Sequence, residues 1–278
     1  MIPYPHINPE IVRIGPVALR WYGLMYAAGF AASYILVRYQ IRKANQGAKA
    51  GGRGNAGAGT GFPDAFLDSL YTYLILGLII GARIGYVLFY DLKSYLNNPL
   101  EIFAVWHGGM SFHGGMIGSI LAGYLCCRKF HVNFWQTADL VIVTAPIGLG
   151  MGRLGNFING ELYGRVTNVP WAMVFPNGGP LPRHPSQLYE FFLEGVLLFT
   201  ILWIAKNRRH MAGAMTSLFL VLYGVFRFVV EFFREPDAQL GFIVGPFTMG
   251  QILSVLTMLG GIVLYIIRKR SVGGKMKG

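Results

Sequence analysis

Long apolar runs separated by short polar stretches dominate the chain. Seven of these runs have roughly the length of about 20 residues that a helix needs to cross the hydrocarbon core of a bilayer. They are predicted at residues 17–37, 66–90, 110–127, 138–158, 187–205, 214–233 and 244–267. The pattern therefore predicts an all-α, polytopic integral membrane protein with about seven transmembrane helices, built as a single membrane-embedded domain over residues 1–278.

Composition agrees with this prediction. Of the 278 residues, 54% are hydrophobic and 13% are charged, and the mean hydropathy is +0.47. Soluble domains contain about 25% charged residues, and disordered chains are much less hydrophobic, so both classes are excluded. With only two cysteines, a disulfide framework and a CxxC-type zinc site are excluded as well. We interpret the adjacent Cys126 and Cys127 as packed or lipid-facing side chains, in preference to lipidation or catalysis.

The distribution of charge predicts the topology. The chain has 24 Lys and Arg against 12 Asp and Glu, a net charge of +12. Most basic residues follow the first, third and fifth apolar runs or lie in the C-terminal tail. The positive-inside rule therefore places the N-terminus in the periplasm and the C-terminus in the cytoplasm. Since the basic residues do not gather on one patch, no nucleic-acid partner is expected.

Two connecting segments differ from the rest. Residues 45–62 are rich in Gly and Ala, which predicts a flexible cytoplasmic linker without chemistry of its own. Residues 159–186 contain several prolines and no long apolar run, which predicts a small irregular periplasmic segment.

Ionisable residues inside the apolar runs are costly unless they face a partner or a wet cavity. Here they fall at helical spacing on one stripe of the sixth run and one stripe of the fifth run. These stripes consist of Tyr223, Arg227, Glu231 and Arg234, and of Gln187, Glu190 and Glu194. Two interpretations stay open. We favour structural pairing between helices for the three glutamates, and a function for Arg227.

The end of the fourth run reads GLGMGRLGNFINGELYGR from Gly148. Bare glycine backbone can approach a headgroup closely, and guanidinium binds phosphate through two parallel hydrogen bonds. The stretch therefore favours an anionic lipid headgroup as ligand. The alternative is a structured loop whose polar groups satisfy one another.

The start of the third run, WHGGMSFHGGMIGS, contains a candidate general base. Histidine titrates near neutrality, which suits proton transfer, although a lone histidine in a membrane is more often structural. Because His113 precedes Gly114 and Gly118, we expect space for a ligand beside it. In the first run, Tyr22 and Tyr26 are i,i+4 neighbours and fit an interfacial aromatic belt without further explanation.

Six strings occur in order between Ile14 and about Ile267: RWYGLMYAAGF, GARIGYVLFY, GGMSFHGGMIG, GRLGNFINGELYGR, RHPSQLYE and YGVFRFVVEFFREPD. Together they resemble bacterial prolipoprotein diacylglyceryl transferases. The resemblance implies a seven-span inner-membrane enzyme that moves the diacylglyceryl group of phosphatidylglycerol onto the lipobox cysteine thiol of a preprolipoprotein. It also implies a thioether product, release of glycerol phosphate, and no metal or soluble cofactor.

The resemblance also implies site residues by motif. The implied catalytic residues are His113, Arg153 and Arg227, and the implied substrate-binding residues are Tyr22, Asn156, Glu161, Gly164, Tyr223 and Glu231. Three features depart from many relatives: the residue at His107, which receives no role, the Gly/Ala linker, and a shorter segment at 166–181.

Both lines of reasoning suggest one mechanism. His113 would take the thiol proton, while Arg153 and Arg227 would bind the departing phosphate group near the periplasmic leaflet. The partners are then phosphatidylglycerol, the signal peptide of a preprolipoprotein and membrane lipid. Two other classes stay open: a transporter or flippase that uses the same arginines to bind anionic phospholipid, and a non-catalytic lipid-binding or scaffold protein.

Overall fold

The computed structural model describes residues 2–5, 7–15, 17–50, 61–104, 108–208, 210–236, 242–245 and 247–275. Within these ranges the chain is mostly helical, as predicted, with two short antiparallel hairpins that the pattern did not predict. The chain divides into two compact units. One comprises Met1–Val37 and Ala138–Gly278, and the other comprises Arg38–Thr137.

Three of the described helices are long and apolar enough to cross a membrane, namely Phe66–Phe89, Ser186–Ala205 and Met249–Ser271. The helices Phe134–Ile142 and Ala145–Ile158 add a fourth candidate if they form one span bent by 41°. Helix Ala214–Val230 is apolar but shorter. The described helices thus give three or four candidate spans by length and composition, and the number seven stays a prediction.

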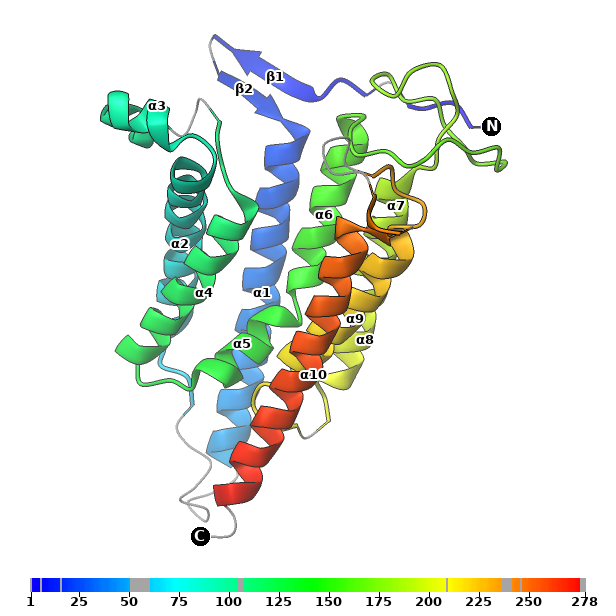
Figure 1. Ribbon diagram of the computed structural model, residues 1–278. Helices are drawn as coiled ribbons and strands as arrows, with labels where there is room; N and C mark the ends of the chain where they lie inside the picture. The colour runs from blue at the N-terminus through cyan, green and yellow to red at the C-terminus, as the bar shows by residue number, and fades with distance from the viewer. Residues whose placement is uncertain are drawn as a thin grey trace. The chain divides into compact units, whose positions relative to one another are not determined.

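The first unit is built around helices that come from distant parts of the sequence (Figure 1). In chain order its elements are β1 (Glu10–Ile14), β2 (Val17–Arg20), the first part of α1 (Trp21–Ala50), most of α5 (Phe134–Ile142), α6 (Ala145–Ile158), α7 (Ser186–Glu190), η3 (Phe191–Leu197), α8 (Leu198–Ala205), α9 (Ala214–Val230), β3 (Phe242–Val244), β4 (Phe247–Thr248) and α10 (Met249–Lys275). From α7 to α8 the chain is one continuous helix whose middle, η3, is a π-helix.

The hairpins correct two predicted boundaries. The first apolar run was predicted to be helical from residue 17, but β2 occupies its start and α1 begins at Trp21. Gly15 adopts φ +59°, a left-handed conformation that allows the chain to turn back between β1 and β2. The seventh run begins in the same way, because β3 and β4 precede α10.

α9 and α10 pack side by side in antiparallel directions (Figure 1). Glycines at both ends of the contact allow this approach. A Cβ on Gly224 would lie 2.8 Å from the Ser254 carbonyl oxygen, and one on Gly261 would lie 2.9 Å from the Ser217 carbonyl oxygen. In lipid, where apolar side chains gain little from leaving the solvent, such small residues provide the close packing that joins helices.

A half-buried carboxylate fixes the start of α9. Asp139 of α5 accepts hydrogen bonds from the Gly213 and Thr216 backbone N–H groups, at 2.7 and 2.8 Å, and from the Thr216 hydroxyl at 2.8 Å. These donors belong to the first turn of a helix, where N–H groups have no intrahelical acceptor and the dipole favours negative charge. Asp139 therefore acts as an N-terminal cap from a different helix, a role that its local sequence does not indicate.

The second unit contains the end of α1, α2 (Phe66–Phe89), α3 (Leu92–Asn97), η1 (Pro99–Phe103) and α4 (Phe112–Lys129). α1 continues to Ala50, so residues 45–50 of the predicted linker are helical, and residues 51–60 lie outside the described residues. The Asn45 side chain is joined to Phe62: its amide group donates to the Phe62 carbonyl oxygen at 3.0 Å, and its Oδ1 accepts from the Phe62 backbone N–H at 2.9 Å.

Glycines also join α2 to α4, which lie side by side (Figure 1). Gly77 and Gly81 face Gly114 and Gly118, and a Cβ on any of the four would meet backbone atoms or a side-chain carbon of the other helix at less than van der Waals distance. This arrangement corrects the expectation that Gly114 and Gly118 leave space for a ligand. That space is filled by α2.

Arg83 organises the chain that links α2 to α4. Its guanidinium donates to the carbonyl oxygens of Glu101, Ile102, Ala104, Gly108 and Gly109, at 2.5 to 3.2 Å. The side chain is buried and has lost its hydrating water, so the five carbonyl oxygens take the place of that water around the cation. Arg83 therefore serves the fold of this unit.

The irregular segment between α6 and α7 is held mainly by Arg183. Its side chain donates to the Gly178 and Gly164 carbonyl oxygens at 2.9 and 3.2 Å, pairs with Glu235 at 2.9 Å and lies over the Tyr163 ring. The Tyr4 hydroxyl ties the same region to the end of α6 through the Phe157 carbonyl oxygen, at 2.6 Å. The segment is thus irregular, as predicted, but extensively hydrogen-bonded.

His184 packs the end of this segment against Tyr189 of α7. Its Nδ1 lies 3.0 Å from the Tyr189 hydroxyl, which accepts a hydrogen bond from the Trp171 indole at 2.7 Å, and its ring packs against Phe233. Burial among these rings lowers the pKa of His184 from its usual value of 6.5, because the charged imidazolium is less well solvated there.

Substituting Gly118→Ala tests the contact between α2 and α4. The new methyl group would collide with the Gly77 carbonyl oxygen, so we expect a loss of about 1–3 kcal/mol in stability, the range of overpacked sites. The measurement is the unfolding midpoint of the purified protein in detergent. Gly260→Ala on α10 is the control, because no atom lies within 4 Å of its Cβ position, and its midpoint should stay equal or rise. Equal midpoints for the two variants would contradict this packing.

Acidification should destabilise the protein through His184. Because the pKa of His184 is lowered in the folded state, the unfolded chain binds the proton more tightly, and stability decreases as pH falls from about 6.5 through the folded-state pKa. We expect the unfolding midpoint of the wild type to drop more between pH 7.5 and 5.5 than that of His184→Gln, which cannot titrate. Identical pH profiles would refute this role.

Candidate active site

A close helix contact positions the first arginine of the site. Gly150 of α6 packs directly on Gly195 of η3, with the Cβ position of Gly150 only 3.1 Å from the Gly195 Cα. Arg153 lies one turn beyond Gly150. Its Nε therefore reaches Glu190, the last residue of α7, and pairs with Glu190 Oε2 at 2.5 Å.

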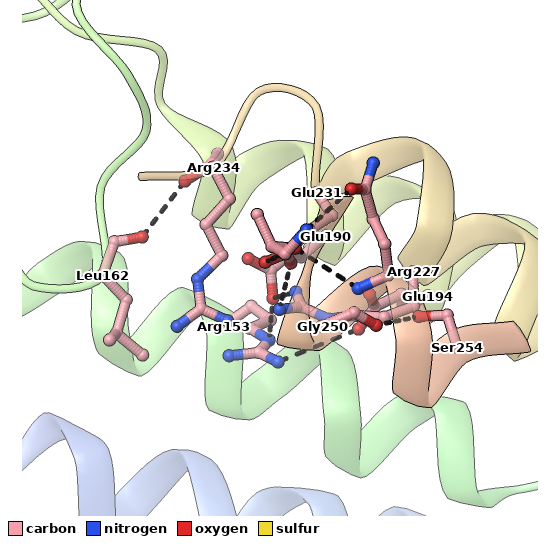
Figure 2. A network of polar contacts seen from close by, with 12 residues as sticks. Arg153, Leu162, Glu190, Glu194, Arg227, Glu231, Arg234, Gly250 and Ser254 are labelled. Carbon is pink, nitrogen blue, oxygen red and sulfur yellow. Dashed lines mark hydrogen bonds and ion pairs between the residues drawn. The ribbon is translucent and has the colours of Figure 1, made fainter. Parts of the chain in front are cut away.

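The second arginine reaches the same carboxylate from another helix. Arg227 of α9 places Nη1 3.3 Å from Glu190 Oε2 and Nη2 2.6 Å from Glu231 Oε2. Figure 2 shows Arg153 and Arg227 pointing toward Glu190, with Arg234 extending toward the same cluster. The structure thus brings together the two arginines that the sequence nominated, on one oxygen atom of Glu190.

Burial differs between the acids and the bases of this cluster. The side chains of Glu190 and Glu194 are 0% exposed, whereas Arg153 is 20% and Arg227 12% exposed. Nη1 of Arg227 is itself buried and faces Glu190 Oε2. The glutamates are therefore sealed from solvent, while the two arginine side chains are partly open to it.

Glu231 is fixed by the hairpin that precedes α10. Its Oε1 accepts a hydrogen bond from the Thr248 hydroxyl at 3.0 Å, and its carboxylate rests against the bare backbone of Gly250. The other oxygen faces Arg227. Held from both sides, the Glu231 carboxylate can orient Arg227.

The glycine-rich end of α6 forms a second polar group. Glu161 Oε1 accepts hydrogen bonds from the Asn156 and Asn159 side-chain amides, at 2.9 and 3.0 Å, and the Glu161 carbonyl oxygen accepts from Gln187 at 2.6 Å. The Glu161 contacts follow the alternative weighed above, a loop that satisfies its own polar groups. Glu161 remains exposed, so it can also meet a ligand.

Tyr22 lies beside this group. Its ring fits against Gly155 of α6, where a Cβ would come within 2.8 Å of the ring, and its hydroxyl lies 3.2 Å from that of Tyr26. Tyr22 also interacts electrostatically with Glu161 and Arg153. The start of α1 is thereby joined to the polar end of α6.

Two of the predicted binding residues, Gly164 and Tyr223, are packed closely against neighbouring residues. Gly164 is enclosed, because a Cβ there would collide with the Phe233 carbonyl oxygen and come within 2.7 Å of the His184 Cβ. Tyr223 stacks on Phe219 and interacts electrostatically with Glu194. The packing around Gly164 by itself requires glycine, whatever its part in binding.

His113 lies in the second unit, in the first turn of α4. Ser111 caps that helix by accepting the Gly114 backbone N–H at 3.3 Å, and the His113 side chain is exposed. The arginine cluster belongs to the first unit. A role for His113 as base therefore stays a prediction. His107, to which no role was assigned, lies outside the described residues.

Glu190 has a larger part in the site than the sequence pattern indicated. Its helical spacing with Glu194 indicated one polar stripe, and pairing between helices was the favoured interpretation. That pairing is what the structure shows, but it occurs with both candidate catalytic arginines at once. Only the packing of α6, α7 and α9 reveals this, because the three residues lie far apart in the sequence.

The cluster can bind an anion. Two guanidinium groups from different helices meet at one point, and both arginine side chains are partly exposed. Such an arrangement is suited to a phosphate group, because guanidinium groups donate two parallel hydrogen bonds to its oxygens in a site of low dielectric constant.

Comparison with known proteins identifies the family. A family model described as prolipoprotein diacylglyceryl transferase matches residues 9–267. The phosphatidylglycerol–prolipoprotein diacylglyceryl transferase of Desulfotalea psychrophila is 53% identical over 270 residues, which cover 95% of this chain and 94% of the relative. Its counterpart from Geobacter sulfurreducens is 52% identical over 271 residues, or 97% and 99% of the two chains. This multi-pass membrane chain belongs to the prolipoprotein diacylglyceryl transferase family.

Proposed function

We propose that this protein transfers the diacylglyceryl group of phosphatidylglycerol to the lipobox cysteine thiol of preprolipoproteins, the first step of lipoprotein maturation. One observation carries the proposal. A member of this transferase family places Arg153 and Arg227 on a single buried carboxylate, while both arginine side chains stay partly exposed.

The substrates follow from the names of the relatives, which specify phosphatidylglycerol and prolipoprotein. We infer the same partners here, together with the surrounding membrane lipid. A transporter or flippase of anionic phospholipid is not favoured, because the family and its named relatives are transferases.

The reaction is a displacement at a glyceryl carbon. The cysteine sulfur forms a C–S bond as the C–O bond to the phosphate group breaks, and the electron pair of that bond leaves with glycerol phosphate. A free thiol has a pKa of about 8.5, so only a few per cent is thiolate at pH 7, and a base increases the reactive fraction. We propose that His113 is this base and accepts the proton of the cysteine thiol.

The departing phosphate carries the developing negative charge. Arg153 and Arg227 neutralise that charge in a site largely removed from water, where fixed donors are most effective. Glu231 orients Arg227. Asn156 is hydrogen-bonded to Glu161, and Tyr22 interacts with both Glu161 and Arg153, so we assign these three residues to the glycerol headgroup. We include Gly164 and Tyr223 in the binding site by family resemblance.

We also propose a topology. Seven spans, with a periplasmic N-terminus and a cytoplasmic C-terminus, would place the active site toward the periplasmic side of the bacterial inner membrane. In this topology residues 45–62 are a cytoplasmic linker, residues 159–186 are a periplasmic segment, and residues 1–278 act as one catalytic domain. The support is the concentration of basic residues after alternate apolar runs.

One assay tests the proposed function. Purified protein is incubated with phosphatidylglycerol vesicles and a lipobox peptide, and the peptide mass is measured. We expect a mass increase of one diacylglyceryl group on cysteine, together with release of glycerol phosphate. A transporter or a lipid-binding protein would leave the peptide unmodified.

The controls test the chemistry of the same reaction. A Cys→Ser peptide should remain unmodified, because the hydroxyl is a much weaker nucleophile at neutral pH. Arg153→Ala should lose about 10²–10³ in rate, the usual effect of removing a transition-state donor, while the protein still inserts into the membrane. Near-normal turnover by this variant would refute its role in binding the phosphate.

His113→Ala separates a base from a scaffold residue. If His113 accepts the thiol proton, a rise in pH toward about 8.5 supplies thiolate directly and should partly restore the rate. The measurement is the initial rate between pH 7 and 9, normalised to inserted protein. A loss that does not change with pH would assign His113 a structural role.

A further inference from the structure

Glu190 lies between the two arginines of the site in a way that the proposed mechanism does not use. Its Oε2 is 2.5 Å from Arg153 Nε and 3.3 Å from Arg227 Nη1, and its side chain is 0% exposed. A carboxylate without access to water depends on these cations for its stability, and the cations depend on it in turn. The three groups therefore form one electrostatic unit.

The other acids of the cluster have narrower roles. Glu231 pairs with Arg227 and with the Thr248 hydroxyl, while Glu194 lies 3.9 Å from Arg153 Nη2. Within the described residues, Glu190 alone is paired with both arginines.

We propose that Glu190 is a positioning residue that holds Arg153 and Arg227 in the geometry needed to bind the phosphate group. The inference rests on the proposed function and deepens it. Two guanidinium groups aimed at one point repel each other, and the repulsion grows as water is removed. The negative charge of Glu190 cancels this repulsion and keeps both donors facing the position where the leaving group develops its charge.

This role predicts that Glu190 acts on turnover more than on lipid binding. The carboxylate adds negative charge to a site that must accept an anion, so its removal should not weaken the attraction for phosphatidylglycerol. It should, however, release the arginines from their fixed positions, and preorganised donors are what stabilise a transition state. A residue that only supported the fold would lower the amount of active protein and leave both kinetic constants of the folded fraction unchanged.

Glu190→Gln tests this separation, because glutamine keeps the size of the side chain and removes its charge. In the mass-spectrometric assay, with phosphatidylglycerol varied and the lipobox peptide in excess, we expect kcat to fall at least tenfold and KM for the lipid to stay equal or decrease. Rates are normalised to folded protein measured by size-exclusion chromatography. A smaller fall in kcat, or a raised KM, overturns the proposal.

Asp139→Asn is the matched control, since Asp139 is a half-buried carboxylate of the same unit that caps α9. We expect a lower unfolding midpoint with kcat and KM of the folded fraction unchanged. If Glu190→Gln does not fold, Glu190→Asp decides. It keeps the charge but is one methylene shorter, so it reaches one guanidinium in place of two, and kcat should fall at least fivefold at unchanged KM. A smaller fall overturns the proposal.

The outcome distinguishes this inference from the proposed function. A wild-type protein that leaves the peptide unmodified contradicts both. A wild type that transfers the diacylglyceryl group, together with a Glu190→Gln variant of equal kcat, contradicts the positioning role alone.

Discussion

A charge inside an apolar helical protein has to be compensated within the protein, and this constraint governs the first unit. Glu190 is sealed from solvent and sits against Arg153 and Arg227. Isolated buried charges cost several kcal/mol, and removing one partner of a buried pair leaves the other unpaired. The cluster therefore joins α6, α7 and α9 at a fixed place, and the hairpin before α10 joins them through Thr248 and Glu231.

Close contacts between glycines make this compensation geometrically possible. An ion pair between helices requires the backbones to approach, and bulky residues at the crossing would keep the charges apart. Gly150 on Gly195 brings α6 to η3 beside Arg153, and Gly250 leaves room for the Glu231 carboxylate. The second unit uses the same kind of glycine contact between α2 and α4, so glycine packing occurs in both units.

Other charged residues in apolar helices serve the fold and differ from the two arginines of the cluster. Arg83 binds five backbone carbonyls and Asp139 caps α9, so both serve the fold although each lies in an apolar helix. Arg153 and Arg227 are different because their side chains remain partly exposed. Accessibility, and not the presence of charge, separates the groups that can bind a ligand from those that only hold the protein together.

The sequence by itself determined the helical, membrane-embedded character of the chain, the family resemblance and the choice of Arg153 and Arg227 as candidate site residues. Apolar run length, helical periodicity and motif spelling are local properties, so they can be recognised along the chain. Only the tertiary structure decided that both arginines share Glu190, that α2 fills the space beside Gly114 and Gly118, and that Asp139 caps a helix more than 70 residues away. Periodicity shows which face of a helix is polar, but the partner of that face depends on how distant helices pack. That packing is fixed by contacts between glycines, and a single sequence does not show which glycines meet.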